Sequence, residues 1–312
     1  MVIAGIDIGG TFIKGGLCNE KGEILYNGSV RTECSETGLV EGVSGLVVRM
    51  LQEKGISRSE LAGIGMGIPG MIDGETGRIL YANNLKIEDF CIVRELEKKF
   101  GAPVRITNDA NAAALGEAKF GSGKGCGDSI LVTLGTGVGG GVVLGGKIFE
   151  GNKGAGAELG HMVIVAGGEL CTCGRRGCLE AYASATALIR ETRRAMERNP
   201  ESRMWEGISD LAEVDGRTAF AHREHDSAAA KVVEEYIYYL GEGLVSFASI
   251  FRPEVIILGG GVSKEGENLV RPLQEKMDAE IYGGSRGPRV EIRVASLGNR
   301  AGLVGAAALF LA

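Results

Sequence analysis

Gly5-Ile6-Asp7-Ile8-Gly9-Gly10-Thr11 joins a short apolar run, one aspartate and a glycine turn at the start of the chain. Residues 2–8 are rich in β-prone side chains, and two further apolar runs follow at 12–18 and 23–30, joined by the turn-forming Asn19-Glu20-Lys21-Gly22. The chain is therefore predicted to begin with a strand, a glycine-threonine turn, a second strand and a hairpin.

The same pattern returns near the middle of the chain. Thr133-Leu134-Gly135-Thr136-Gly137-Val138-Gly139 again places a glycine-threonine turn after an apolar strand, and residues 139–144 and 147–150 continue as strands. A unit that occurs once in each half predicts two related lobes that face a cleft.

The remaining pattern alternates strands and helices, which predicts an α/β protein. Strands are expected at 62–68, 103–107, 129–134, 254–258 and 289–294. Helices are expected at 38–53, 89–100, from Asn108-Asp109 onward, and at 226–250, 262–278 and 301–311. Residues 196–225 are polar and weakly periodic, and are predicted to be a loop-rich insertion.

Composition excludes several classes of protein. The 312 residues carry a net charge of −6 and no long basic run, so no nucleic-acid surface is indicated. The N-terminus lacks the pattern of a signal peptide, and no uncharged apolar run reaches the ~18 residues of a membrane span. Seven cysteines, an odd number with three in one loop, argue against a disulfide framework and favour the cytosol.

Those three cysteines follow a histidine. Gly160-His161 precedes Cys171-Thr172-Cys173-Gly174-Arg175-Arg176-Gly177-Cys178-Leu179-Glu180. Thiolate and imidazole are zinc ligands, and four of them complete a tetrahedral shell without an open position for water. The predicted metal site, His161 with Cys171, Cys173 and Cys178, is therefore structural, although Glu158 and Glu180 flank it.

The glycine-rich segments Gly65–Gly70 and Gly135–Gly140 match the dinucleotide-binding spacing, but neither runs into a helix as that site requires. A Walker A loop is not found either. Glycine turns can instead cradle phosphate oxygens with backbone N–H groups. Ordinary hairpins that need glycine are the alternative for each turn taken alone. Thr11 and Thr136 add hydroxyl donors and Lys14 a positive charge, while Asp7 is placed to hold Mg²⁺ through water.

Taken together, these motifs resemble a known family. Asp7–Thr11, Leu134–Gly141 and Leu258-Gly259-Gly260-Gly261-Val262 are similar to the nucleotide-binding elements of actin-like sugar kinases. Glu158–His161 with Cys171–Glu180 resembles the zinc signature of the ROK branch (repressors, open reading frames and kinases). Within that branch, the segment Asn108–Glu117 looks most like that of bacterial glucokinases.

The resemblance implies a two-lobed, actin-like (RNase H-like) α/β fold with ATP and a hexose in the cleft. Residues 1–107 plus about 300–312 would form the small lobe, and 108–299 the large lobe with the zinc loop. Asp109 is similar to the catalytic base. Matches to sugar-binding residues are Gly70, Asn108, Asp109, Glu158, His161 and Glu180. Matches to nucleotide-binding residues are Asp7, Gly9, Gly10, Thr11, Lys14, Thr136, Gly137, Gly259, Gly260 and Gly261.

The chemistry of these residues suits phosphoryl transfer. Asp109 would accept the proton of a sugar hydroxyl, and the dipole of the helix that it starts would favour its ionised form. The simpler interpretation is that Asp109 or Asn108 only caps that helix. Zinc would orient His161 through one ring nitrogen and leave the other to contact a sugar hydroxyl. A plain helix-opening role is the alternative for Glu180.

The predicted activity is ATP- and Mg²⁺-dependent phosphorylation of glucose at O6, by a cytosolic protein that forms a homodimer or higher homo-oligomer. After Asn83-Asn84-Leu85 many glucokinases carry Gly-Trp, whereas this chain has Lys86-Ile87. N-acetylhexosamine, mannose, fructose or allose therefore remain alternative substrates. A sugar-sensing repressor is disfavoured because Asp7 leaves no room for a preceding DNA-binding segment, and a dehydrogenase because no helix follows the glycines.

Overall fold

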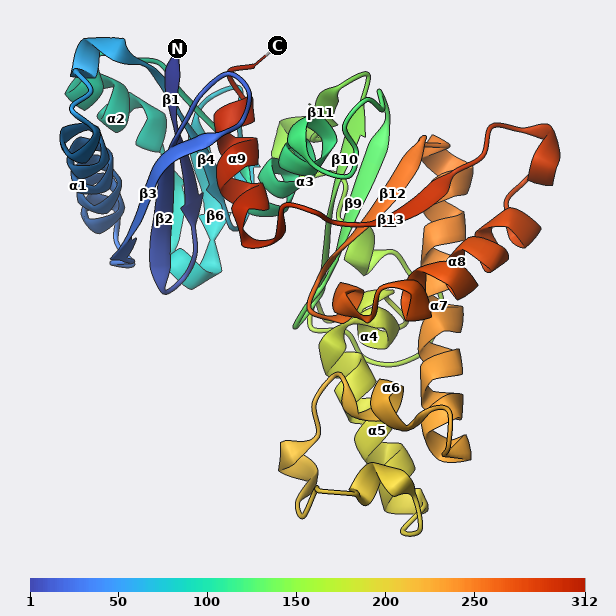
Figure 1. Cartoon of the computed structure of the whole chain (residues 1–312). Helices are drawn as coiled ribbons and strands as arrows, with labels where there is room; N and C mark the ends of the chain where they lie inside the picture. The colour runs from blue at the N-terminus through green and yellow to red at the C-terminus, as the bar shows by residue number, and fades with distance from the viewer. Residues whose placement is uncertain (312) are drawn as a thin grey trace. The chain divides into compact units, whose positions relative to one another are not determined.

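The computed structural model describes residues 1–311 and divides into two units (Figure 1). Unit 1 comprises Met1–Leu131, Gly141–Ala157 and the segment that starts at Ser296, and unit 2 comprises Val132–Gly140 and Glu158–Ala295. The chain passes from one unit to the other inside two strands, β9 (Ser129–Leu134) and β10 (Val138–Leu144).

Unit 1 is built on a five-stranded sheet with the order β3-β2-β1-β4-β8. Its strands are β1 (Val2–Ile8), β2 (Phe12–Cys18), β3 (Ile24–Arg31), β4 (Leu61–Ile68) and β8 (Val104–Asn108). The first three strands are antiparallel, as the predicted hairpins require, whereas β4 and β8 run parallel to β1. The register places Asp7 opposite Lys14 on the neighbouring strand.

One face of this sheet is covered by α1 (Glu36–Lys54) and α2 (Ile92–Phe100). Helix α1 begins where the Ser35 hydroxyl accepts a hydrogen bond from the Gly38 N–H, and it ends at Gly55 in the left-handed conformation. Its buried residues recur at helical spacing and include Val43, Leu46 and Met50, so one apolar stripe faces the strands.

The other face is covered by α3 (Asp109–Phe120) and α9 (Ala301–Ala308), which pack against each other (Figure 1). The two helices approach each other closely because glycines on each helix face the backbone of the other. A Cβ added to Gly305 would lie 1.6 Å from the Ala112 carbonyl oxygen, and one added to Gly116 would lie 2.4 Å from the Ala301 carbonyl oxygen. Only glycine fits at this crossing, which keeps the start of α3 in place.

Gly305→Ala should therefore lower the free energy of unfolding by about 3 kcal/mol, the upper part of the usual range for overpacking, because backbone atoms cannot move aside as side chains do. Gly45→Ala on α1 is the matched control, since nothing lies within 4 Å of the added methyl group. The control should gain ~0.5–1 kcal/mol from its helical backbone. Chemical denaturation of both variants measures the difference, and equal effects would contradict the packing argument.

Unit 1 also contains a three-stranded antiparallel sheet with the order β5-β6-β7. Its strands are β5 (Met71–Asp73), β6 (Arg78–Ala82) and β7 (Ile87–Phe90). None of the three was predicted, because each is short and carries few alternating apolar residues. The predicted helix at 89–100 was wrong at its start: β7 occupies residues up to Phe90, and α2 begins at Ile92.

The second five-stranded sheet has the order β11-β10-β9-β12-β13. Besides β9 and β10 it contains β11 (Lys147–Phe149), β12 (Val255–Gly260) and β13 (Glu291–Val294). Gly139 and Gly140 therefore lie in a strand, and the dinucleotide interpretation of that glycine segment is excluded by the structure.

Helices of unit 2 surround the long α7 (Ser227–Phe251), which packs against α4 (Glu180–Ala183), α5 (Ala185–Arg198), α6 (Thr218–His222) and α8 (Glu267–Glu280). The predicted helix at 262–278 is broken at Gly266, whose φ of 56° ends a short 3₁₀ turn before α8. Helix α5 was not predicted, because its sequence is rich in charge. No helix within residues 1–311 combines the length and apolar character that a membrane crossing needs.

Candidate functional site

Two predicted carboxylates lie in unit 1, Asp7 on β1 and Asp109 at the start of α3. Burial raises the pKa of Asp7; the Lys14 ammonium opposes this shift and the Asp109 charge adds to it. Burial also raises the pKa of Asp109, although its carboxylate accepts a hydrogen bond from the Ala110 N–H at 2.9 Å. The helix start favours the ionised Asp109 as expected, since its hydrogen bonds lower the pKa, but burial outweighs them and the net shift is upward.

Asn108 is the N-cap of α3. Its Oδ1 accepts from the N–H groups of Ala110 and Asn111 at 2.8 and 3.3 Å, while its Nδ2 donates to the Gly70 carbonyl oxygen at 3.0 Å. The capping role is confirmed for Asn108. The side chain also fixes the loop of Gly70, whose φ of 118° and close approach to the Tyr81 carbonyl oxygen admit only glycine. One N–H of Asn108 stays available for a ligand.

The first glycine turn is closed by three hydrogen bonds. The Gly9 N–H donates to the Phe12 carbonyl oxygen at 3.0 Å, while Thr32 donates its hydroxyl to the Gly9 carbonyl oxygen at 2.6 Å and its N–H to the Thr11 carbonyl oxygen at 2.9 Å. Gly10 and Thr11 are exposed at the tip. The turn is therefore held by its own backbone and by Thr32, which directly follows β3, with Gly10 and Thr11 open to solvent.

The second glycine turn, Gly135–Gly137, lies in unit 2 and is anchored to α5. The Ala185 N–H donates to the Gly135 carbonyl oxygen at 2.8 Å, and the Thr186 hydroxyl donates to the Thr136 carbonyl oxygen at 2.7 Å. A Cβ on Gly137 would lie 2.4 Å from Glu180 Oε2. The turn is thereby placed directly against a predicted ligand-binding carboxylate.

The third glycine segment, Gly259–Gly261, lies at the end of β12. Gly260 has a φ of 86°, and a Cβ there would lie 2.4 Å from the Leu134 carbonyl oxygen at the end of β9. The Ser263 hydroxyl donates to the Gly260 carbonyl oxygen at 2.9 Å. Gly261 has open space around it. The structure thus brings Gly259–Gly261 beside the strand that leads into the second turn.

The predicted metal ligands converge in unit 2. Ligand atoms of His161, Cys171, Cys173 and Cys178 all lie within 4.8 Å of one another. The Sγ atoms of Cys173 and Cys178 are 3.7 Å apart, and Cys171 Sγ lies 3.5 Å from His161 Nδ1. Tetrahedral zinc bonds of about 2.3 Å to sulfur and 2.0–2.1 Å to nitrogen predict edges of about 3.8 and 3.5 Å. The donor set and its spacing fit a structural zinc ion.

Glu180 joins this cluster to the second glycine turn. Its Oε1 accepts from the Thr172 hydroxyl at 2.6 Å, and its Oε2 accepts from the Val138 N–H at 3.2 Å. Burial raises the pKa of Glu180, but these hydrogen bonds outweigh it and the net shift is downward. The carboxylate is therefore held ionised and in one orientation.

Glu158 and His161 bracket one 3₁₀ turn, in which the His161 N–H donates to the Glu158 carbonyl oxygen at 3.0 Å. His161 directs Nδ1 to the cysteines, which leaves Nε2 on the other side of the ring. Within residues 1–311, the Glu158 carboxylate is exposed and accepts no side-chain hydrogen bond. Both groups can therefore contact a polar ligand.

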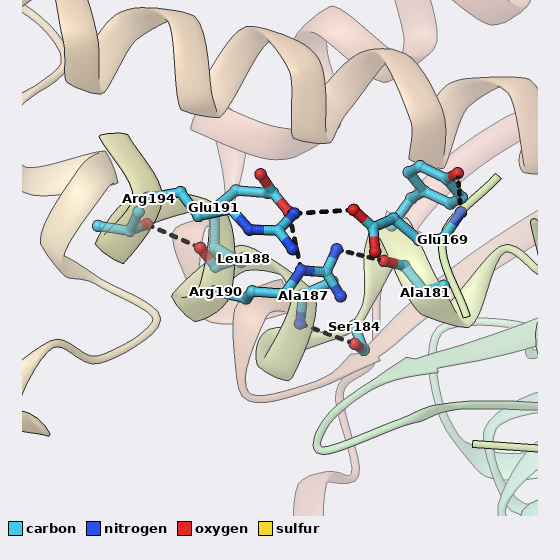
Figure 2. A network of polar contacts seen from close by, with 10 residues as sticks. Glu169, Ala181, Ser184, Ala187, Leu188, Arg190, Glu191 and Arg194 are labelled. Atoms are coloured by element: carbon cyan, nitrogen blue, oxygen red, sulfur yellow. Dashed lines mark hydrogen bonds and ion pairs between the residues drawn. The ribbon is translucent and has the colours of Figure 1, made fainter. Parts of the chain in front are cut away.

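A network of charges fastens the segment around the three cysteines, residues 169–182 (the metal loop), to α5 (Figure 2). Arg194 binds Glu169 and Glu191 at 2.8 and 2.9 Å, and Arg190 donates to the Ala181 carbonyl oxygen at 2.8 Å. The Glu169 N–H also donates to the Tyr182 hydroxyl at 2.7 Å. Helix α5 thus holds both the segment that precedes Cys171 and the helix that begins at Glu180.

Sequence reasoning missed the supporting residues of this site. Thr172 and Arg194 carry no motif of their own, because their partners lie 8 and 25 positions away along the chain. The helical spacing of Arg190 and Arg194 was the one available signal. It would have shown a basic face on α5, but not what that face binds.

Comparisons with known proteins agree with this geometry. The profile of the ROK family matches residues 3–312. A glucokinase from Halalkalibacterium halodurans is 37% identical, and the alignment covers 96% of this chain and 92% of that protein. A xylose repressor from Caldicellulosiruptor bescii is 30% identical, with 99% of this chain and 78% of the repressor covered.

Solved structures show the same relationship. A ROK glucokinase from Streptomyces griseus, solved with glucose and AMPPNP, matches with a TM-score of 0.79 and 36% identity, covering 99% of both chains. A ROK hexokinase from Thermus thermophilus matches with a TM-score of 0.82 and 37% identity over 98% of this chain and 97% of that one. The predicted α/β fold of actin-like type is confirmed, and the chain belongs to the ROK family.

Proposed function

We propose that the protein is an ATP-dependent hexose kinase that transfers the γ-phosphoryl group to the 6-hydroxyl of glucose. The observation that carries the proposal is full-length similarity to glucokinases, including one solved with glucose and a nucleotide analogue, in a chain that has Asp109 at a half-buried helix start. The repressors of the family are less similar and are matched over a smaller share of their length.

Asp109 is the proposed general base. Phosphoryl transfer asks mainly for positioning, charge neutralisation and an acceptor for the hydroxyl proton. As the sugar oxygen bonds to the γ-phosphorus and the bond to the ADP oxygen breaks, the proton passes to the Asp109 carboxylate. A pKa raised by burial makes this carboxylate a stronger proton acceptor than an exposed aspartate.

The glycine turns are the proposed phosphate-binding elements. The residues proposed for this role are Gly9, Gly10, Thr11, Lys14, Thr136, Gly137 and Gly259–Gly261. Backbone N–H groups and hydroxyls at such turns bind phosphate oxygens. Mg²⁺, when bound, would neutralise phosphate charge, and Asp7 would hold it through water.

Sugar recognition is proposed for Asn108, Glu158, His161 and Glu180, with Gly70 lining the site. Carboxylates and amides accept or bridge neighbouring hydroxyls, and a site that bonds a hydroxyl rejects analogues without it. His161 would contact a hydroxyl through Nε2 while zinc holds Nδ1. Zinc is thus proposed as a structural ion that aims one sugar ligand.

Three further proposals accompany this function. The small lobe would comprise residues 1–107 with about 300–312, and the large lobe residues 108–299. The cysteine usage supports a cytosolic protein, and the family resemblance supports a homodimer or higher homo-oligomer.

The decisive experiment measures ADP release with Mg-ATP over a panel of hexoses, using zinc-replete protein. Glucose should give the highest kcat/KM, and N-acetylglucosamine, N-acetylmannosamine, mannose, fructose and allose should give lower values. Turnover on none of them would overturn the kinase proposal. A higher kcat/KM for another sugar would make that sugar the preferred substrate and leave the proposed reaction unchanged.

Arg194→Ala should raise the KM for glucose about threefold and leave kcat almost unchanged, because partly exposed ion pairs contribute only ~0.2–1 kcal/mol. The variant frees Glu169 and with it the segment before Cys171. Arg203→Ala, which breaks the exposed pair with Glu206, is the control in the same unit. Steady-state kinetics of both variants test whether Arg194 supports glucose binding, and equal KM values for the two variants would contradict that role.

A further inference from the structure

Unit 1 contains a cavity of about 410 Å³ where β2, β3 and the beginning of α9 meet. It is lined by Phe12 and Lys14 from β2, Asn27 and Ser29 from β3, and Asn299 and Arg300 from the turn that leads into α9. It adjoins the first glycine turn, because Phe12 directly follows Thr11. We call it the basic pocket.

The charge of the basic pocket is opposite to that of the chain. Lys14 and Arg300 are both exposed cations, and no aspartate or glutamate is among the lining residues, although the chain as a whole carries −6. Within the part of the chain that the structure describes, neither cation forms an ion pair within 4 Å. Two unpaired cations beside one cavity attract a compact anion.

The neutral lining supplies groups for the rest of a ligand. The side chains of Asn27, Ser29 and Asn299 make no hydrogen bond to any residue in 1–311, so amide and hydroxyl groups are available on both sides. Phe12 has 49% of its surface exposed and offers a ring face. Helix α9 begins at Ala301, directly after its N-cap residue Arg300, and the start of a helix adds a weak positive dipole to the same wall.

We propose that the basic pocket binds a phosphorylated small molecule with a polar, ring-sized body. Arg300 and Lys14 would hold the phosphate with charge-assisted hydrogen bonds, and the amides with Phe12 would contact the body. The volume lies within the range usual for small-molecule sites, about 300–1,000 Å³. A bare inorganic anion would leave the amides and the ring without a partner.

Occupancy of the basic pocket is coupled to the reaction through Lys14. Lys14 stands opposite Asp7 across the strand pair, and its charge acts on the Asp7 carboxylate. An anion in the pocket draws the Lys14 ammonium away from Asp7 and from the first glycine turn. Binding should therefore inhibit turnover, and nucleotide should weaken binding by the same factor. This consequence rests on the proposed kinase function, whereas binding itself does not.

The test is calorimetric titration of the full chain without nucleotide, in saturating glucose so that the proposed sugar site is filled. The probes are glucose 6-phosphate, AMP and inorganic phosphate, and the first two distinguish a sugar phosphate from a nucleoside phosphate. Arg300→Glu should weaken binding of the preferred ester about 10- to 100-fold, as expected for loss of a hydrogen bond to a charged group. Arg94→Glu on α2 is the control and should bind normally.

Asn27→Asp is a second variant, on the edge strand and away from α9, and it should also weaken binding. Esters that bind equally to wild type, Arg300→Glu and Asn27→Asp would overturn the proposal, as would inorganic phosphate binding as tightly as either ester. Absence of turnover combined with binding that depends on Arg300 would sink the kinase function and leave the pocket standing. Normal turnover without Arg300-dependent ester binding would refute the pocket proposal and leave the kinase function standing.

Discussion

Asp109→Asn should reduce kcat by about 10²- to 10⁴-fold, the usual contribution of a general base, while the dissociation constant for glucose changes little. The amide has the same shape and can still accept the Ala110 N–H hydrogen bond, so α3 keeps its start. It cannot accept the proton of the attacking hydroxyl. Rapid-quench kinetics and glucose titration of the same preparation separate the chemical step from binding.

Asp89→Asn is the matched control, since Asp89 is an exposed carboxylate that pairs with Arg78 in the same unit. It should keep kcat within about twofold, as surface substitutions usually do. Loss of glucose binding with an unchanged chemical step in Asp109→Asn would refute the base assignment and leave Asp109 a positioning group.

The pH dependence follows from the same residue. The base acts only when ionised, and burial raises the pKa of Asp109 above the ordinary value of 3.8. As pH falls, Asp109 is protonated earlier than an exposed aspartate would be. The acidic limb of kcat/KM should therefore have its midpoint above 3.8, and the control variant should keep that limb in place.

Much of the fold could be predicted from the sequence because the features that determine it are local. Glycine turns after apolar strands occur twice, and helices such as α1 carry a clear apolar stripe. The parts that were missed depend on distant partners. Strands β5, β6 and β7 are short and are stabilised by pairing with one another, so their own residues indicate little. Helix α5 is polar in sequence and finds its role only through contacts with α7 and the metal loop.

The candidate site could be predicted from the sequence to a similar extent. Motif spacing predicted the metal cluster, because three cysteines and a histidine have few other uses, and the structure brings them together. The direction of the Asp109 pKa shift was not predictable, since it depends on burial by residues far away in the sequence. Arg300 was missed for the same reason: nothing in its neighbourhood along the chain shows that it shares a cavity with Lys14 and Asn27.

Removal of the proposed zinc ion should raise the KM for glucose by about tenfold or more while nucleotide binding stays within about twofold, because the ion would hold His161 and the loop of Thr172. Cys178→Ser gives the same change without a chelator. Cys178 is fully buried, so the variant should also lose about 4 kcal/mol of unfolding free energy, as loss of a metal site does. Zinc content, thermal melting and separate glucose and nucleotide titrations measure the three effects.

Cys126→Ser is the control, since Cys126 is half-buried and lies outside the cluster, and it should keep both zinc and glucose affinity. The expected effect passes through a series of contacts: the proposed zinc ion would hold His161 and Cys171, Thr172 follows Cys171, and the Thr172 hydroxyl donates to Glu180. Loss of the ion therefore disturbs two proposed sugar ligands at once. Normal glucose binding by folded, zinc-free protein would show that these contacts do not affect the sugar ligands. The cluster would then stabilise unit 2 without any part in sugar recognition.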